Sequence, residues 1–147
     1  MRRLPFLSIQ KKTENHVHDC GLIVNSFFPY LGATPDGKVC DKGETGLIEV
    51  KCPYTARDCT IDEACESNKF CLKKTNLGIF LKEDHEYYCQ VQGQLMVSGA
   101  GFCDFVIYTK KDLFIERVFP NVAFMQTMLD NLSGFYYKYV EPVICAK

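Results

Sequence analysis

The sequence predicts a mixed α/β fold in which helices flank a central mixed sheet. Residues 47–52 alternate between polar and apolar side chains, which is typical of a half-buried strand. Residues 84–98 have the helical period, and the β-branched and aromatic residues of 102–109 indicate a further, buried strand. Strands and helices therefore alternate along the chain.

Length and composition favour one globular domain. The chain has 147 residues, of which 47% are hydrophobic and 24% are charged, enough for a sizeable core. It contains no apolar run of the roughly 18 residues that a membrane-spanning helix needs, and its first residues do not form a secretory signal. We therefore expect an intracellular, soluble protein, with nucleus and cytoplasm not distinguished and no membrane partner.

The sequence predicts an antiparallel meander for the N-terminal half of the domain. Residues 1–19 lack a clear period and stay unassigned, and His16 and His18 fit a solvated polar turn better than a ligand pair. We place the domain at residues 20–147. The β-branched and aromatic residues of 20–28 predict a strand.

Further strands and a helix follow in the middle of the chain. A short strand at 39–40 precedes the strand at 47–52. Asp58, Thr60 and Asp62 are three candidate caps for a short helix predicted near 60–67. Residues 70–72 and 78–81 form a predicted hairpin.

The C-terminal half is predicted as helix, two strands and helix. Asp84 is the expected cap of the helix at 84–98, and residues 113–119 form the strand after 102–109. Asn121 is the expected cap of a last helix, and its Met and aromatic stripe is predicted to be core.

A turn and a strand bring together candidate groups for metal-dependent chemistry. Glu49 and Lys51 lie on one face of the 47–52 strand, because side chains alternate along a strand. The Asp-Gly turn at 36–37 lets the chain double back, so Asp36 is expected beside Glu49. Mg²⁺ is usually held by one or two carboxylates and substrate phosphates, and a nearby lysine can act on a water. The alternative is an ordinary exposed Glu/Lys pair beside a turn.

The nine cysteines and the net charge bear on other functions. An odd number of cysteines without a regular framework favours free thiols in a reducing compartment. The sequence has no Cys-x-x-Cys pair of the kind found in common zinc sites among Cys52, Cys59, Cys65 and Cys71, so buried thiols are the favoured alternative to zinc binding.

A formal net charge of -1 counts against a strongly basic nucleic-acid binder.

Three motifs in a fixed order carry a family resemblance. They are LGATPDG at 31–37, GLIEVKCPY at 46–54 and YYCQVQGQ at 87–94. Taken together, these motifs resemble those of YqaJ-type viral recombinase domains, of the phage lambda exonuclease-like branch of the PD-(D/E)xK nucleases. Residues 103–106 and 115–117 are similar to the later strands of that family. The resemblance implies a restriction-endonuclease-like core, and it extends over about residues 21–140.

The resemblance also implies roles for individual residues. Asp36 and Glu49 would be metal ligands, joined by the backbone carbonyl of Val50, with Mg²⁺ or Mn²⁺ as the cofactor. Lys51 would act on the nucleophilic water, and Gln90 would support the lysine and the water.

Two further residues match family positions that contact substrate. Thr34 stands where a serine touches the 5′-phosphate of the DNA end. Arg57, with Asp58, matches a pair that either contacts DNA or braces the loop. Possible partners in this family are the ends of double-stranded DNA, a second copy of the chain and a single-strand annealing protein.

The resemblance predicts a metal-dependent exonuclease that hydrolyses phosphodiester bonds of linear double-stranded DNA, with 5′-to-3′ polarity, in recombination or repair. Members of the family carry helices before the first strand, whereas residues 1–19 are too few to supply them. We therefore expect the catalytic half of such a domain. The alternative is a catalytically weak or inactive nucleic-acid-binding remnant.

Overall fold

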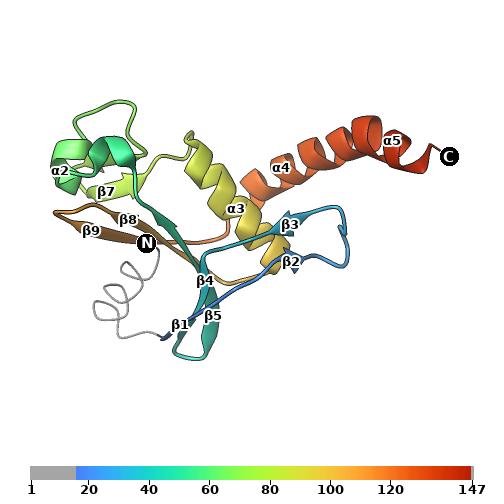
Figure 1. Cartoon of the computed structure of the whole chain (residues 1–147), viewed down its shortest axis with the longest axis horizontal. Helices are drawn as coiled ribbons and strands as arrows, with labels where there is room; N and C mark the ends of the chain where they lie inside the picture. Colours follow the sequence, from blue (N-terminus) through green and yellow to red (C-terminus); the bar gives the residue numbers. More distant parts are fainter. Residues whose placement is uncertain (1–15, 147) are drawn as a thin grey trace.

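A five-stranded mixed sheet forms the centre of the molecule (Figure 1). The structure is a computed structural model that describes residues 16–146. The sheet order is β1-β4-β5-β8-β9, and β5 and β8 are parallel whereas the other neighbouring pairs are antiparallel. Its strands are β1 (His16–His18), β4 (Gly37–Asp41), β5 (Glu44–Lys51), β8 (Cys103–Tyr108) and β9 (Leu113–Val118).

Two short hairpin-like pairs and several helices surround this sheet. The small strands are β2 (Ile23–Val24) with β3 (Gly32–Ala33), and β6 (Leu72–Thr75) with β7 (Gly78–Leu81). The α-helices are α2 (Ile61–Ala64), α3 (Glu86–Ser98), α4 (Val122–Phe135) and α5 (Glu141–Cys145). A 3₁₀ turn (Tyr54–Ala56) follows β5, and a π-helical segment (Tyr136–Val140) joins α4 to α5. The structure confirms the predicted strands and helices in the second half of the chain, with small shifts at their ends.

The two faces of the sheet belong to two hydrophobic clusters. Leu47 packs with Val91 and Leu95 of α3, whereas Ile48 packs with Val39 and other residues on the opposite face. This alternation directs the side chains at 47, 49 and 51 toward α3.

Close packing against Phe102 requires a glycine at position 46, near the start of β5. A Cβ atom at Gly46 would lie 2.1 Å from the ring of Phe102, so only glycine fits this position without a shift. Hydrogen bonds support the same contact, since the Leu47 N–H donates to the Phe102 carbonyl at 2.9 Å.

The central helix α3 has well-defined ends. His85 is the N-cap, and its Nδ1 accepts a hydrogen bond from the Tyr87 N–H at 3.1 Å. The prediction of Asp84 as the cap was wrong by one residue. Gly99 ends the helix in the left-handed conformation, with φ of 68°, which glycine adopts without a steric penalty.

The sequence predicted two N-terminal segments incorrectly. His16 and His18 lie in β1, paired with β4, and not in a polar turn. The pairing also packs Val17 against the core. The strand predicted at 20–28 is reduced to Ile23–Val24, because the Asn25 side chain accepts from the Phe27 N–H at 2.9 Å and turns the chain. Most of the unassigned segment, residues 1–15, lies outside the described residues.

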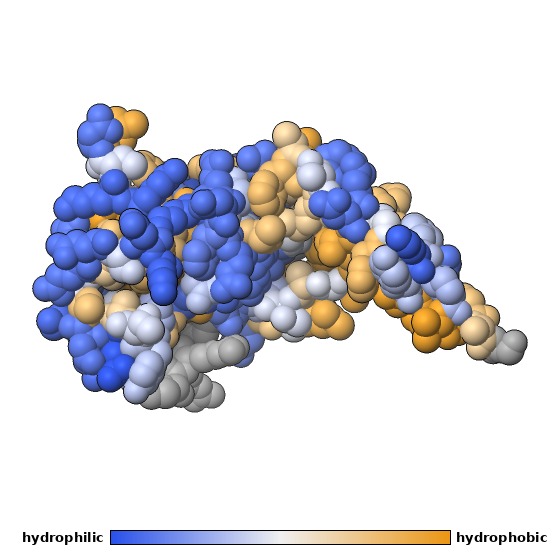
Figure 2. Space-filling model, turned by 90° about the horizontal axis from the view of Figure 1, so that it is seen from above, coloured by the Kyte–Doolittle hydropathy of each residue, from blue (hydrophilic) through white to orange (hydrophobic). Residues whose placement is uncertain are grey.

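The last helix differs from its prediction. α4 has no buried residue, although Phe124 and Met125 in its first turns pack partly against the core. We call residues 126–145 the arm, which projects away from the sheet (Figure 1). Figure 2 shows hydrophobic side chains gathered along it, and Phe135, Val143 and Ile144 are exposed. The helical period predicts which residues share a face, but not whether another element covers that face.

The arm is fastened near its middle to the loop between β2 and β3. The Tyr30 ring stacks on Tyr136 with 4.1 Å between centroids, and its hydroxyl lies 2.9 Å from that of Ser133.

No helix within residues 16–146 is long and apolar enough to span a membrane.

Candidate active site

The antiparallel register of β4 and β5 brings Asp36 to the site strand. Gly37 pairs with Ile48, so the residue before Gly37 lies opposite the following part of β5. The Val50 N–H donates to Asp36 Oδ2 at 2.9 Å. The structure therefore brings together the two stretches that the sequence predicted to meet.

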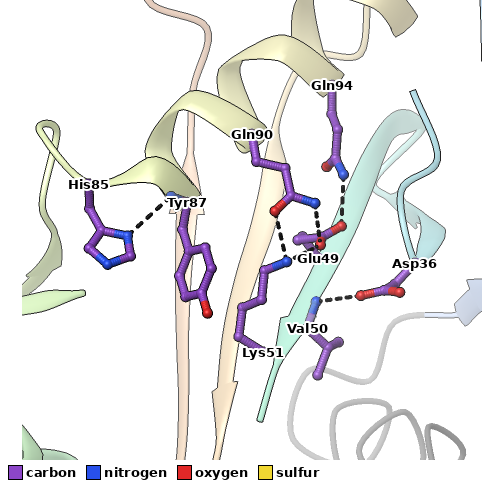
Figure 3. A network of polar contacts seen from close by, with 8 residues as sticks. All are labelled: Asp36, Glu49, Val50, Lys51, His85, Tyr87, Gln90 and Gln94. Atoms are coloured by element: carbon purple, nitrogen blue, oxygen red, sulfur yellow. Dashed lines mark hydrogen bonds and ion pairs between the residues drawn. The ribbon is translucent and has the colours of Figure 1, made fainter. Parts of the chain in front are cut away.

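Glu49 is a buried carboxylate surrounded by donors, with only 4% of its surface exposed. Oε1 accepts from Lys51 Nζ at 2.7 Å and from Gln90 Nε2 at 2.8 Å. Oε2 accepts from Gln94 Nε2 at 2.8 Å. Figure 3 shows both amides reaching from α3 toward this one carboxylate. A buried charge is stable only when it is paired and hydrogen-bonded, and these contacts meet that requirement.

Lys51 is held by two polar partners and an aromatic ring. Its Nζ donates to Gln90 Oε1 and to Glu49 Oε1, each at 2.7 Å. It also lies 4.8 Å from the centroid of the Tyr87 ring. These contacts fix the ammonium group beside Glu49 (Figure 3).

Thr34 lies beside this network and not within it. The residue is exposed and lines a hollow of about 290 Å³ together with Gln90 and Gln94. Its hydroxyl is thus near the candidate site on the side of the β3–β4 connection. A role in binding a phosphate stays a prediction.

Arg57 is part of a loop contact next to β5. Its guanidinium lies 3.9 Å from the Tyr54 ring centroid and 3.1 Å from an oxygen of Asp58. Lys110, in the turn between β8 and β9, donates its backbone N–H to the Arg57 carbonyl and its Nζ to Asp58. The hydrogen bond from Lys110 lowers the pKa of Asp58. These contacts brace the loop, and a contact of Arg57 with DNA stays a prediction.

Comparison with known proteins identifies the family. The model of the YqaJ-like viral recombinase domain matches residues 9–101. The chain belongs to this family. The match and the mixed sheet confirm the predicted family and fold class. The predicted domain limits, 20–147, stay a prediction.

Relatives of this YqaJ-like chain include two baculovirus proteins. It is 27% identical to the alkaline nuclease of Autographa californica nuclear polyhedrosis virus, over all of this chain and 38% of that protein. It is 29% identical to the alkaline nuclease of Orgyia pseudotsugata multicapsid polyhedrosis virus, over 66% of this chain and 26% of that protein. The chain thus spans well under half the length of these relatives.

Two solved structures share the fold of the YqaJ-like chain. The alkaline exonuclease LHK-Exo from Laribacter hongkongensis has a TM-score of 0.70 and 27% identity, covering 93% of this chain and 63% of that one. LHK-Exo in complex with dAMP gives 0.71 and 28% over the same shares.

The donor set of this YqaJ-like domain fits a hard divalent cation. Asp36, Glu49 and the backbone carbonyl of Val50 supply only oxygen atoms, which Mg²⁺ and Mn²⁺ prefer. Among the described residues, Glu49 Oε1 accepts two hydrogen bonds and Oε2 accepts one, which leaves Oε2 the less occupied oxygen.

Other metal sites lack support in the described part of the chain. Residues 16–146 contain no group of three His, Cys, Asp or Glu side chains that could hold a metal ion. The nine cysteines are free thiols. Burial raises the pKa of Cys71 to about 11, so this thiol behaves as a small apolar group.

The sequence did not predict Gln94 as a site residue. The helical period placed it at the edge of the buried face of α3, one turn after Gln90. Its spacing from Gln90 was the available signal, since residues four apart on a helix reach the same neighbour. Which neighbour they reach depends on how α3 lies across β5.

Proposed function

We propose that the chain is a metal-dependent exonuclease that hydrolyses phosphodiester bonds of linear double-stranded DNA, in recombination or repair. The contact set of Glu49, Lys51 and Gln90 beside Asp36 carries the proposal. Membership of the YqaJ-like family and the names of the relatives, alkaline nuclease and alkaline exonuclease, support it.

Each side chain has a task in this hydrolysis. Asp36, Glu49 and the Val50 carbonyl would hold Mg²⁺ or Mn²⁺, and the cation would offset negative charge on the phosphodiester. Lys51 would orient the attacking water through the third N–H of its ammonium group, because the other two N–H bonds donate to Glu49 and Gln90. Gln90 keeps the lysine in place and ties it to Glu49.

The substrate end lies on the side of the exposed Thr34 hydroxyl in this proposal. The family resemblance gives Thr34 the position of a serine that touches the 5′-phosphate of a DNA end, and the threonine hydroxyl can donate to that phosphate in the same way. A 5′-phosphorylated end would then be preferred, and digestion would run from 5′ to 3′. A second copy of the chain or a single-strand annealing protein would extend the DNA path. Duplexes labelled at one 5′ or one 3′ end distinguish the two polarities.

The test uses 5′-phosphorylated linear duplex with and without Mg²⁺, and a closed circular duplex. We expect Mg²⁺-dependent loss of the linear DNA and no loss of the circle. Lys51→Ala should reduce the rate roughly 100- to 1000-fold, as removal of one aimed polar group does elsewhere. Lys111→Ala, which removes an exposed lysine in the β8–β9 turn, is the matched control and should keep the rate.

Two results would contradict the proposal. Equal, metal-independent degradation by the wild type and Lys51→Ala would assign the activity to something other than this site. Salt-dependent DNA binding without any Mg²⁺-dependent product would instead favour the nucleic-acid-binding remnant.

A further inference from the structure

Three glutamines of α3 have different surroundings. Gln90 is exposed, whereas Gln92 and Gln94 are buried. Gln92 joins α3 to the segment before α4, because its Nε2 donates to the Phe119 carbonyl and its Oε1 accepts from the Asn121 N–H, each at 2.9 Å. Gln92 is therefore a structural residue with both ends of its amide satisfied.

Gln94 is bonded at one end only. Its Nε2 donates to Glu49 Oε2 at 2.8 Å, but its buried Oε1 has no hydrogen-bond partner among residues 16–146. The orientation of the amide follows from chemistry, since an ionised carboxylate only accepts hydrogen bonds and so must face the NH₂ group. An unpaired buried acceptor destabilises a fold, and an apolar side chain of similar size would avoid this penalty.

Gln94 also makes a contact that no other residue of the network duplicates. Lys51 and Gln90 both donate to Glu49 Oε1, so they fix one oxygen of the carboxylate. Among the described contacts, Gln94 alone donates to Oε2. Figure 3 shows the two amides one helical turn apart, each reaching from α3 to a different oxygen of the carboxylate. Together they fix its plane, whereas one of them alone would leave it free to rotate.

We propose that Gln94 is a positioning residue that sets the orientation of the Glu49 carboxylate for the divalent cation. The inference rests on the proposed function, because it assumes that Glu49 binds the cation. Groups that orient a metal ligand change metal affinity by about 10- to 100-fold when they are removed. The unpaired Oε1 lowers the stability of the fold, and this cost accompanies the placement of an amide donor beside Glu49 Oε2.

The test compares two glutamine-to-methionine variants of the same helix. Binding of Mn²⁺ to the DNA-free protein is followed by the electron paramagnetic resonance signal of free Mn²⁺, and thermal unfolding is recorded in parallel. Gln94→Met should weaken Mn²⁺ binding about 10-fold and lower the melting temperature less than Gln92→Met does, because it removes one hydrogen bond together with one unpaired acceptor, whereas Gln92→Met removes two hydrogen bonds. Gln92→Met should lower the melting temperature and keep the Mn²⁺ affinity.

A shorter amide and a nuclease assay complete the test. Gln94→Asn, which is one methylene too short for the contact, should also weaken Mn²⁺ binding. For Gln94→Met the Mg²⁺ concentration needed for half-maximal cleavage should rise, and the rate should recover at saturating Mg²⁺. If the Gln94→Met protein had wild-type Mn²⁺ affinity, the role of Gln94 would be overturned. The proposed function would still stand if the wild-type protein cleaved DNA. A wild type that neither binds Mn²⁺ nor cleaves DNA would overturn both.

Discussion

Two helices of similar length, α3 and α4, have opposite surroundings. Six of the 13 residues of α3 are buried, including two glutamines, whereas none of the 14 residues of α4 is. α4 is nevertheless the more apolar helix. The difference shows that position against the sheet decides burial: α3 lies on the face that carries Glu49, while most of α4 extends beyond the sheet (Figure 1).

The comparison of the helices predicts different costs for the same core-type substitution. Leu95→Ala should lower the free energy of unfolding by about 2–5 kcal/mol, because Leu95 is 2% exposed and its loss leaves a cavity. Leu132→Ala on the arm should lower it by less than about 1 kcal/mol, because Leu132 is 39% exposed. Urea denaturation measures both. Equal losses of unfolding free energy in the two variants would mean that the arm is as tightly packed as the core around α3.

A second prediction concerns the polar contacts of α3. Gln90→Leu removes the acceptor of Lys51 and one donor to Glu49, so the nuclease rate should fall about 10- to 100-fold. Gln90 is exposed, so the melting temperature should hardly change. Gln126→Leu, an exposed glutamine of α4, is the matched control and should keep the rate. An unchanged rate in Gln90→Leu would remove that residue from the site.

The thiols provide a chemical measure of the same difference. Burial raises the pKa of Cys71 to about 11 and also raises the pKa of Cys103. Alkylation with iodoacetamide near pH 8, followed by mass spectrometry, should label the exposed thiols first, among them Cys145 on the arm. Cys71 and Cys103 should react only after unfolding. Rapid labelling of Cys71 in the folded protein would contradict its burial.

The smallest expected effect is a pH dependence of stability that comes from Glu116 in β9. Burial raises the pKa of Glu116 above its ordinary value of 4.5, although the Leu81 N–H donates to its carboxylate at 2.6 Å. Below pH 4.5 the group is protonated in both states and contributes nothing. As the pH rises through the interval between the two pKa values, the unfolded state releases its proton first and stability falls.

Glu116→Gln removes this loss of stability. The variant should therefore gain stability relative to the wild type as the pH rises from about 4 to about 7, measured by urea denaturation at each pH. A difference that stays constant over this interval would show that Glu116 does not titrate abnormally.

Local patterns predicted much of the fold. Alternation along β5 put Glu49 and Lys51 on one face, and the side chains of Thr60 and Asn121 cap their helices as expected. These features depend on neighbours within a few residues, so the sequence contains the information needed. The β6–β7 hairpin follows from the same kind of signal.

Features that depend on distant residues were harder to predict. The strand at His16–His18 exists because β4 offers an edge for pairing, 20 or more residues later in the chain. The early strand at 20–28 was overestimated for one local and one distant reason. Asn25 accepts from the Phe27 N–H, which is a local turn, and it also donates to the carbonyl of the distant Val97, a contact that local composition does not show.

Local sequence patterns indicate which chemical groups share a face, and the ordered motifs indicate the family. Which of those groups meet depends on how distant elements pack. The crossing of α3 over β5 brings Gln90 and Gln94 to the two oxygens of Glu49, and the reach of the sheet leaves the arm uncovered. The physical reason is range: strand alternation and helix caps depend on adjacent residues, whereas burial and hydrogen-bond partners depend on elements that are far apart in the chain.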